Sequence, residues 1–475
     1  MKLISPRLAG SAALLAAVCA CSSGGWLGTA DSSANRATTA APADSENSRT
    51  AASAVSRAAV PVSGSDQDYA AIIAATANVR RIMLGESTHG TSEFYRERGR
   101  LTEQLIQMHG ANAIAIEGDW SPTWRVNLYV RGLSGDRSAA EALGGFTNFP
   151  QWMWPNTDFA DFIERLRASN LSKPEAQRVG VYGMDVYDIF NAADFVLAYL
   201  RTRDTSAATR AEKLYRCFRP YKRSTSAYGE ATVGGRTSCK REAEAVTGIV
   251  GTMGRPSEPR EAEEHFAAVR AAASVKAGEE YFRVAYGGSL AWNARDRSME
   301  RNVEDIAAHA EAQTGRPGKV VIWSHNSHTG DARATDMRNR GELNLGQLMR
   351  ERHGDAAFLV GYFAHGGTVF AAPAWDEPGR TYDMRPANPG SHAALLRASG
   401  TPAFSLLIRG NKELARLLEA PMEQRAIGVV YRPESERPSH YFRASLSSQF
   451  DAVLYFDRST AVTPLRQRAG FKTGQ

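Results

Sequence analysis

The fold is indicated by one stretch of the sequence, Arg81-Ile82-Met83-Leu84-Gly85-Glu86-Ser87-Thr88-His89-Gly90. Its first four residues read as an apolar run that predicts a buried strand, and a helical pattern follows over residues 91–109. This order places Glu86 and His89 on the turn after the strand. In open α/β sheets, ligands bind beyond the carboxyl ends of the strands. A carboxylate and an imidazole on such a turn can share a proton-transfer task.

The same event recurs along the chain. Short apolar runs at 111–116, 179–184, 319–323 and 357–362 are each followed by acidic or imidazole side chains. Such runs, alternating with helical patterns at 95–109 and 157–168, are typical of a parallel sheet covered on both faces. We expect further strands at 404–408, 426–431 and 450–456. The sequence therefore predicts an α/β fold with a central, mostly parallel sheet flanked by helices.

The middle of the chain differs, because residues 192–313 carry almost no strand pattern. Helices are expected at 192–203, 207–218, 239–253, 260–284 and 292–313. We interpret this region as a helical insertion subdomain between two halves of the sheet. No internal repeat is visible.

The N-terminus has the pattern of an export signal. A basic start is followed by an apolar segment at 8–18, which is too short to span a bilayer. It ends in Val18-Cys19-Ala20-Cys21, which resembles a bacterial lipobox and would make Cys21 the lipid-bearing first residue. Ordinary cleavage near Ala20 is the alternative. We expect an exported protein, in the periplasm or at the outer membrane as a lipoprotein, that touches the membrane only through this anchor.

Residues 22–63 are rich in Ala, Ser and Thr, which predicts a flexible linker and leaves 64–475 for a catalytic domain. Cys217 and Cys239 form an even pair in an exported chain, which favours one disulfide over two buried thiols. That bridge would stabilise the fold by about 3 kcal/mol.

Composition limits the function classes. The 475 residues are 43% hydrophobic and 23% charged, as in ordinary globular proteins. The net charge of +6 is mild for this length, and Lys and Arg form no dense block. We therefore expect no nucleic-acid partner. A small-molecule substrate is the expected partner, and the oligomeric state stays open.

If the strands are parallel, the polar groups that follow them converge at one edge of the sheet: Glu86, His89, Glu117, Asp185, His325 and His328. The sequence contains no Gly-x-Ser-x-Gly, Ser-x-x-Lys, His-Glu-x-x-His, Walker or Gly-x-Gly-x-x-Gly motif. These absences weigh against a serine nucleophile elbow, phosphoryl transfer and hydride transfer.

Two chemistries remain for this cluster. In the first, a histidine takes a proton from water, carboxylates orient the imidazoles, and a second histidine or an arginine stabilises the oxyanion. In the second, His89, His325 and His328 with Glu86 or Glu117 bind a divalent metal that generates hydroxide. A third reading, from another class, is a non-catalytic binding protein of the cell envelope.

Five motifs, in this order, resemble those of the erythromycin esterase family. They are residues 85–94, 116–120, 183–187, 293–299 and 323–328, and the likeness extends from about Asp66 to Phe456. The resemblance implies hydrolysis of the lactone ester of macrolides such as erythromycin by an activated water, with macrolide resistance as the result. It implies no covalent serine intermediate. No cofactor is expected, although the metal alternative stays open.

Carried over by motif, the resemblance implies that His89 is the essential base and Glu86 its neighbouring acid. The other implied catalytic residues are Glu117, His325, His328, Arg98 and Arg295, with Arg301 as a register alternative to Arg295. His325, His328 and Arg98 would hold the substrate or the oxyanion.

The aromatic segment 148–156 is a candidate wall of a large apolar pocket, since pockets for bulky neutral ligands are rich in aromatic side chains. The expected substrate-binding residues are Asp119, Trp120, Trp152 and Trp154. For these tryptophans, plain core packing is the alternative.

Overall fold

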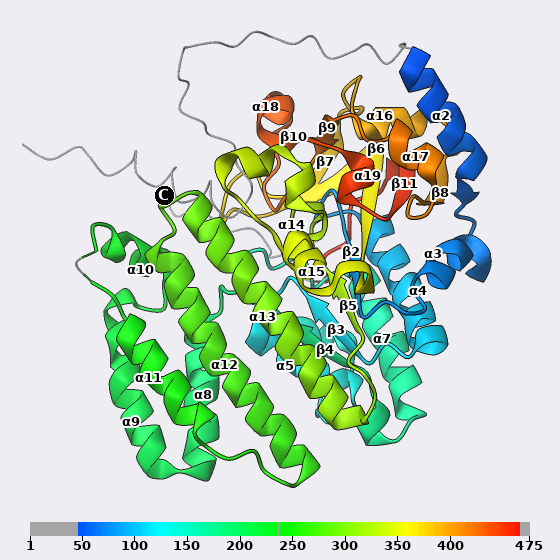
Figure 1. Ribbon diagram of the computed structural model, residues 1–475. Coiled ribbons are helices and arrows are strands. Elements are labelled where there is room, and N and C mark those ends of the chain that lie inside the picture. Colours follow the sequence, from blue (N-terminus) through cyan, green and yellow to red (C-terminus); the bar gives the residue numbers. More distant parts are fainter. Residues whose placement is uncertain (1–45, 236, 466–475) are drawn as a thin grey trace, which may run out of the picture.

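The computed structural model describes residues 46–235 and 237–465 (Figure 1). Its centre is a nine-stranded sheet with the order β1-β8-β11-β6-β2-β5-β3-β4, and β7 pairs with β6. The strands are β1 (Val60–Pro61), β2 (Arg81–Leu84), β3 (Ala113–Ile116), β4 (Gly180–Gly183), β5 (Val320–Trp323), β6 (Ala357–Ala371), β7 (Arg380–Met384), β8 (Ala403–Leu407) and β11 (Ala452–Ser459). All pairs among β2–β6 and β11 are parallel. The predicted α/β fold with a mostly parallel sheet is confirmed.

Side chains of the central strands alternate between two hydrophobic cores. In β5, Val320 and Ile322 belong to one core, whereas Val321 and Trp323 belong to the other. Strands β2 and β3 divide their residues in the same way. Both faces of the sheet are therefore buried, which explains why these strands are continuous apolar runs in the sequence.

Helices cover both faces. One core includes residues of α3 (Ala70–Ala75), α4 (Ser92–His109) and α7 (Thr157–Leu171). The other includes residues of α13 (Ser289–Thr314), α15 (Leu345–His353) and α16 (His392–Arg397). The remaining elements are α5 (Trp120–Val130), α6 (Ala139–Ala142), α14 (Asn326–Thr329), α17 (Lys412–Leu417), α18 (Glu436–His440), α19 (Leu446–Gln449), β9 (Met422–Arg425) and β10 (Tyr441–Ala444). Within the described ranges, no helix combines the length and apolar character needed to cross a bilayer.

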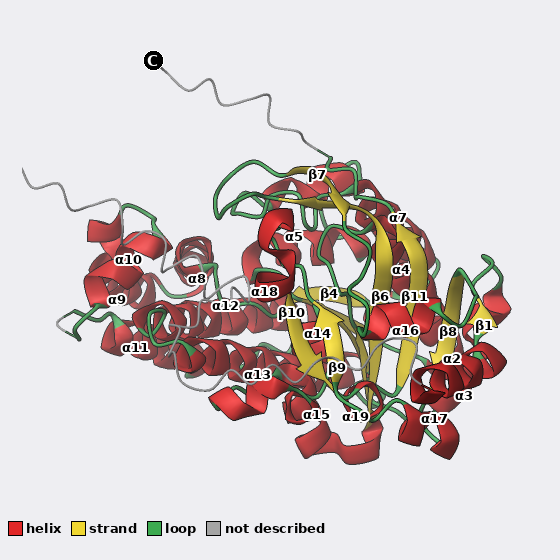
Figure 2. Cartoon of the chain, turned by 90° about the horizontal axis from the view of Figure 1, so that it is seen from above, coloured by secondary structure: helices red, strands yellow, loops and turns green. Residues whose placement is uncertain are grey.

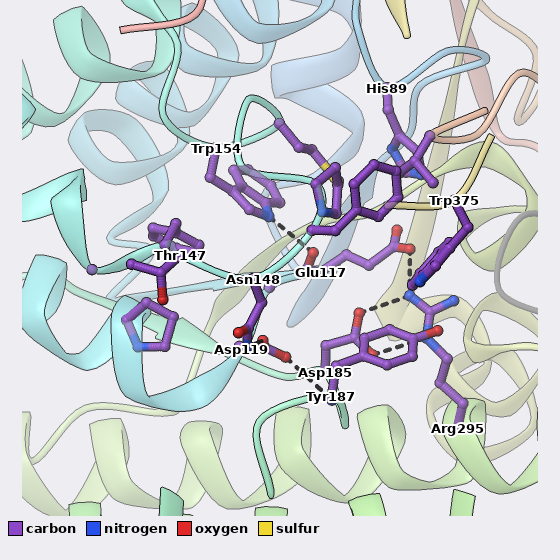
Figure 3. Close-up of a pocket in the computed structure, with 18 residues that line it drawn as sticks. His89, Glu117, Asp119, Thr147, Asn148, Trp154, Asp185, Tyr187, Arg295 and Trp375 are labelled. Atoms are coloured by element: carbon purple, nitrogen blue, oxygen red, sulfur yellow. Dashed lines mark hydrogen bonds and ion pairs between the residues drawn. The ribbon is translucent and has the colours of Figure 1, made fainter. Parts of the chain in front are cut away.

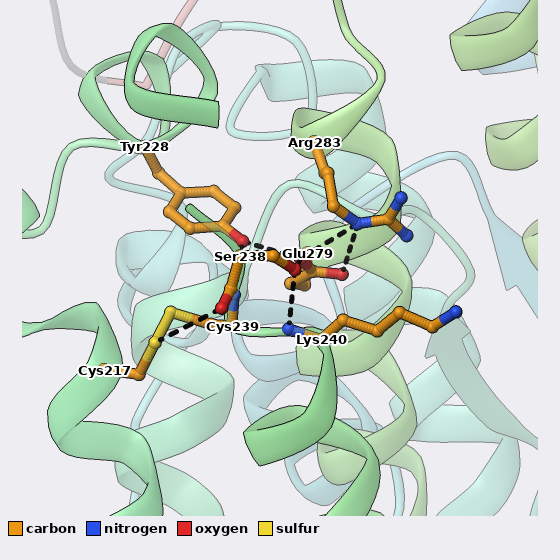
Figure 4. Close-up of a disulfide and its surroundings, with 7 residues drawn as sticks. All are labelled: Cys217, Tyr228, Ser238, Cys239, Lys240, Glu279 and Arg283. Atoms are coloured by element: carbon orange, nitrogen blue, oxygen red, sulfur yellow. Dashed lines mark hydrogen bonds and ion pairs between the residues drawn. A yellow bond between two sulfur atoms is a disulfide. The ribbon is translucent and has the colours of Figure 1, made fainter. Parts of the chain in front are cut away.

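Helices alone connect β4 to β5 in the described residues, and Figure 2 shows them as a bundle beside the sheet. They are α8 (Ile189–Arg203), α9 (Thr205–Tyr215), α10 (Thr225–Thr232), α11 (Lys240–Gly251), α12 (Pro259–Arg283) and α13. The short α10 has no counterpart among the expected helices. The predicted disulfide joins Cys217 to Cys239, 22 residues apart (Figure 4). Beside it, the Tyr228 hydroxyl accepts from Cys239 N and donates to Glu279.

Two expectations need correction. The linker predicted for 22–63 is wrong for its last part, where α2 (Glu46–Ala58) and β1 lie. Ala51, Ala54 and Val55 share one face of α2 and are buried in the core, and alanine is the strongest helix former. The export signal, the lipobox and Cys21 lie outside the described residues.

The strand predicted at 426–431 is also wrong. This segment follows β9 and crosses the carboxyl edge of the sheet, where it makes only the isolated bridges Thr88–Ile427 and Ala372–Val430. Its apolar side chains are buried against the loops at that edge rather than in a strand ladder.

Candidate active site

Glu86 and His89 form a hydrogen-bonded pair on the turn after β2. Glu86 Oε1 lies 2.9 Å from His89 Nδ1, and Glu86 Oε2 accepts from Arg98 Nη2 at 2.8 Å. Because a guanidinium only donates, Arg98 keeps Glu86 as an acceptor. The His89 proton then lies on Nδ1, and Nε2 carries the lone pair that a base requires.

Segments from the far end of the sequence hold this turn in place. His89 N donates to Ile427 O at 3.2 Å, and Ile427 N donates to Ser87 O at 2.9 Å. Beyond the last strand, Val462 N donates to Gly90 O at 3.0 Å. The position of His89 therefore depends on backbone bonds to residues that come more than 300 positions later.

A second group of side chains centres on Arg295, from α13 (Figure 3). Its Nε and Nη2 donate to the two carboxylate oxygens of Asp185 at 2.8 and 2.7 Å, and Nη2 also donates to Glu117 Oε1 at 2.7 Å. Burial alone would lower the pKa of Arg295. The nearby Asp185 and Tyr187 have the larger effect, so the net pKa is raised above its usual value. Arg295 is thus a permanent cation held by a planar, bidentate hydrogen bond to the Asp185 carboxylate.

Glu117 is an ionised carboxylate in this group. Burial raises its pKa, but His328, Arg295 and His89 together hold the pKa well below its usual range. Its second oxygen accepts from His325 N at 2.7 Å. The carboxylate therefore links β3 to the turn after β5 as well as to Arg295.

Three neighbouring side chains fix the position of the His328 ring. Its Nδ1 lies 2.8 Å from Asp296 Oδ1, and the Trp292 ring stacks on it at 4.5 Å between centroids. Arg295 Nη1 lies 2.9 Å from Nε2, which accepts this hydrogen bond when the ring is neutral and its proton lies on Nδ1. Burial lowers the pKa of His328, whereas Asp296 and Glu117 raise it by more.

His325 lies beside His89, with ring centroids 4.9 Å apart. Its Nδ1 is 2.8 Å from Ser327 Oγ. Burial, and secondarily the charge of His89, hold the pKa of His325 well below its usual range. His325 is therefore a neutral imidazole beside His89.

A cavity of about 70 Å³ lies beside these groups, and Glu86, His325 and His328 are not among its lining residues. His89, Glu117 and Arg295 line it, together with Asp119 and Trp154. Trp154 Nε1 donates to Glu117 O at 3.0 Å, so this tryptophan also fixes the end of β3.

The structure corrects two of the predicted binding residues. Trp120 is buried in the core, stacked on Trp124 and Tyr182, because α5 turns it away from the cavity. Trp152 packs edge-on against Phe370 at 5.3 Å, since the 146–156 segment turns it away from the cavity.

Arg98 also departs from its expected role. It is fully buried and does not line the cavity, and its guanidinium lies over the rings of Tyr95 and Trp323. Contact with substrate or oxyanion is therefore the wrong expectation for Arg98. It acts on the cavity only through Glu86. Arg301, the register alternative, is exposed, and Arg295 occupies the site.

Asp119 differs from Glu117 in the direction of its pKa shift, although both line the cavity. Burial and the nearby carboxylates of Asp188 and Asp185 raise the pKa of Asp119 well above its usual range. It accepts from Tyr187 N at 3.2 Å and lies 3.2 Å from Asn148 Nδ2. Asp119 therefore ionises less readily than Glu117.

The donor sets do not fit the metal alternative. The nitrogens of His328 are engaged by Asp296 and Arg295, and His89 Nδ1 is engaged by Glu86. In the described part of the chain, no group of three or more His, Cys, Asp or Glu side chains is arranged to hold an ion.

Several residues of the site were missed from the sequence. Asp296 directly follows Arg295, and this adjacency on one helix was the available signal. Tyr187, Phe149 and Trp375 also line the cavity. Trp375 comes from the loop between β6 and β7, and no local pattern connects that loop to the motifs.

Comparisons with known proteins bear on the family and the fold of this chain. The family model described as "Erythromycin esterase" matches residues 106–459, so the match begins after the Glu86–His89 turn. A solved succinoglycan biosynthesis protein is similar, with a TM-score of 0.70 and 18% identity over 88% of this chain and 98% of that one.

Two further solved structures share the fold. A protein from Bacillus cereus has a TM-score of 0.72 at 16% identity, covering 89% of this chain and 100% of that one. A mutant of the erythromycin esterase EreC, in its open conformation, has a TM-score of 0.59 at 14% identity, covering 84% and 95%. The family model spans most of the sequence, and the chain therefore belongs to the erythromycin esterase family.

Proposed function

We propose that the protein is a carboxylic ester hydrolase that opens the lactone ester of macrolides such as erythromycin, or a related bulky ester. The observation that carries this proposal is the Glu86–His89 pair, whose imidazole lines a cavity beside a fixed guanidinium. No serine or cysteine is among the described residues that line this cavity, which supports water as the nucleophile.

The reaction follows from these positions. His89 Nε2 takes a proton from water as the water oxygen bonds to the ester carbonyl carbon, and Glu86 stabilises the imidazolium. Arg295 stabilises the negative charge on the carbonyl oxygen. The ester C–O bond then breaks, and the proton on His89 passes to the leaving alkoxide. One water and one ester give one acid and one alcohol.

The carboxylates of the site have separate positioning roles in this reaction. Asp185 and Glu117 hold Arg295 in one orientation, so little reorganisation is needed when charge develops. Asp296 fixes the tautomer of His328, which in turn accepts from Arg295. Asp119 and Trp154 would contact the substrate from the opposite wall.

Incubation with a panel of macrolides, followed by mass spectrometry, tests the proposal. A gain of one water by at least one macrolide, absent with His89→Ala, is the expected result. Sensitive cells that express the protein should also tolerate more of that macrolide. If no macrolide gains water, the macrolide assignment is wrong. If hydrolysis persists at full rate in His89→Ala, the assigned base is wrong.

We also propose export and lipid attachment at Cys21. The Cys217–Cys239 disulfide supports an oxidising compartment. Fractionation should find the wild type with membranes and Cys21→Ala in the soluble envelope fraction. Recovery of the wild type without lipid in the soluble fraction would reject the anchor.

A further inference from the structure

A second, larger cavity adjoins the one that holds His89. It has a volume of about 400 Å³, against about 70 Å³ for the inner cavity. Both are lined by the same five residues, Thr147, Asn148, Phe149, Tyr187 and Trp375. The two cavities are therefore neighbours that meet at these residues, one inner and one outer.

Aromatic rings lie where the two cavities meet. The rings of Phe149 and Trp375 lie 4.7 Å apart, and those of Tyr187 and Trp375 lie 6.4 Å apart. Figure 3 shows Trp375 and Tyr187 beside Arg295. The Arg295 guanidinium lies 5.1 Å from the Tyr187 ring centroid. A molecule that reaches Arg295 and extends into the outer cavity would therefore lie against these rings.

The wall of the outer cavity combines aromatic faces with neutral polar groups. Tyr281 and Trp375 bring aromatic rings to this wall, and Thr225 and Ser226 bring hydroxyl groups that both donate and accept. Asn191 adds an amide whose oxygen already accepts from Arg223. Flat apolar faces and paired donors and acceptors together match a sugar ring, which has C–H faces and a rim of hydroxyl groups.

The charged side chains of the wall are one cation, Arg223, and one carboxylate, Asp376, so no single sign of charge dominates and a neutral ligand is favoured. Arg223 is the cation at this cavity, and its guanidinium donates to Asp194 and Asn191, both at 2.7 Å. Since Asp194 neutralises it, Arg223 offers little net attraction to an anion.

Unusual backbone conformations gather at this cavity. In the described ranges, the non-glycine residues with positive φ are Lys222 (48°), Arg223 (64°) and Asp376 (63°). Arg223 and Asp376 both line the outer cavity, and Lys222 precedes Arg223. Such conformations are uncommon for residues with a Cβ and concentrate at sites that bind ligands.

The disulfide supports the same wall. Cys217 and Cys239 enclose the segment that carries Arg223, Thr225 and Ser226. The wall on the side of the helical insertion is therefore tied covalently at both ends.

We propose that the outer cavity is a second substrate subsite, which binds a neutral, polyhydroxylated, sugar-like part of the substrate while the inner cavity holds the ester carbonyl. This inference rests on the proposed esterase function. The inner cavity is too small for a sugar ring beside the scissile group, whereas the outer one is of the size found for small-molecule sites.

Three acetate esters that differ only in the alcohol test the subsite: ethyl acetate, decyl acetate and 6-O-acetylglucose. Acetate release gives kcat and KM for each. We expect the highest kcat/KM for 6-O-acetylglucose, through a lower KM. A preference for decyl acetate would mean an apolar-chain site and overturn the proposal, as would equal kcat/KM for the ethyl and glucosyl esters.

Two variants localise the effect. Asn191→Ala removes one hydrogen-bonding group, and we expect the ratio of kcat/KM for the glucosyl ester to that for the ethyl ester to fall by about three- to ten-fold. Ser226→Phe should fill the cavity and abolish the preference. The matched control is Asn339→Ala, at an exposed position outside both cavities. Unchanged ratios in Asn191→Ala and Ser226→Phe would reject the subsite.

Direct binding separates this proposal from the esterase function. Saturation-transfer NMR with methyl α-glucoside should show binding to the wild type and not to Ser226→Phe. If no ester is hydrolysed but the glucoside binds, the esterase function fails and the subsite stands. If esters are hydrolysed but the glucoside does not bind, the subsite fails alone.

Discussion

Asp296 meets His328 Nδ1 with both carboxylate oxygens, at 2.8 and 3.0 Å, and one of these oxygens also accepts from Leu345 N at 2.8 Å. The carboxylate is fully buried, and it fixes the His328 tautomer that accepts from Arg295. The cation in the cavity is thus oriented by a residue that does not line the cavity.

We expect Asp296→Asn to lower kcat by about ten- to hundred-fold, because one hydrogen bond to a charged group is lost. KM should change little, since Asp296 does not reach the substrate. Ester hydrolysis at several pH values measures the effect. The control is Asp305→Asn, on the same helix but half-exposed and paired with Arg270. Equal effects of both changes would contradict a positioning role.

Glu117 and Asp119 provide a matched pair of neutralising substitutions. The charges around Glu117 hold its pKa far below neutrality, so Glu117→Gln removes a real negative charge beside Arg295. Burial and the neighbouring carboxylates raise the pKa of Asp119, so Asp119→Asn removes less negative charge than Glu117→Gln does. We expect kcat/KM to fall by about hundred-fold in Glu117→Gln and less than about three-fold in Asp119→Asn. The reverse order would refute this charge assignment.

Arg98 and Glu86 form a fully buried ion pair. Arg98→Met leaves the buried Glu86 carboxylate without its cation and with His89 as its remaining partner, and we expect the free energy of unfolding to fall by about 3–5 kcal/mol. The double change Arg98→Met with Glu86→Gln should recover much of that loss, because no uncompensated charge remains. Urea unfolding of the three variants measures the coupling. Additive losses would show that the two side chains do not interact.

His392 makes stability depend on pH. Burial lowers its pKa from 6.5 to about 4. Between pH 4 and 6.5 the unfolded chain therefore binds a proton at His392 that the folded protein does not bind. The stability contribution is complete above pH 6.5 and is lost as pH falls towards 4, by about 3 kcal/mol in total. His392→Gln should reduce the slope of unfolding free energy against pH in this window. An unchanged slope would show that His392 does not cause it.

The Cys217–Cys239 disulfide lies in the helical insertion, and we expect it to stabilise the folded protein. A bridge that closes a loop of this length stabilises the folded state by about 3 kcal/mol, because it lowers the conformational entropy of the unfolded chain. We expect Cys217→Ser with Cys239→Ser to lower the melting temperature, and a reductant to have the same effect on the wild type only. Hydrolysis of ethyl acetate should continue in the folded double variant. Sensitivity of the double variant to reductant would assign the effect to another cause.

The central strands were predictable because burial on both faces leaves an apolar run that ends where the catalytic turns begin. His89, Glu117, Arg295 and His328 could be found because each lies at a strand end or within a motif. Trp120 and Trp152 have the composition of a pocket wall, but the direction of a side chain depends on packing. The 426–431 segment reads as a strand because buried loops and buried strands use the same apolar residues.

The site also contains contacts between residues that are far apart in the sequence, and no local sequence pattern indicates them. Trp375 reaches the cavity from a loop beyond the long β6, and Asp296 acts through a histidine of another element. Helix α2 was obscured because alanine and serine suit both a linker and a helix that packs closely. In each case the deciding information is the tertiary neighbour.

The backbone bonds between the His89 turn and residues Ile427 and Val462 have a consequence for the order of events during synthesis. The N-terminal part of the chain already carries the base, its acid partner and the arginine that pairs with them. The turn that aims the base is completed only when the segment after the last strand has left the ribosome and docked. A fragment that ends before residue 462 would lack the bond from Val462 N to Gly90 O that closes this turn.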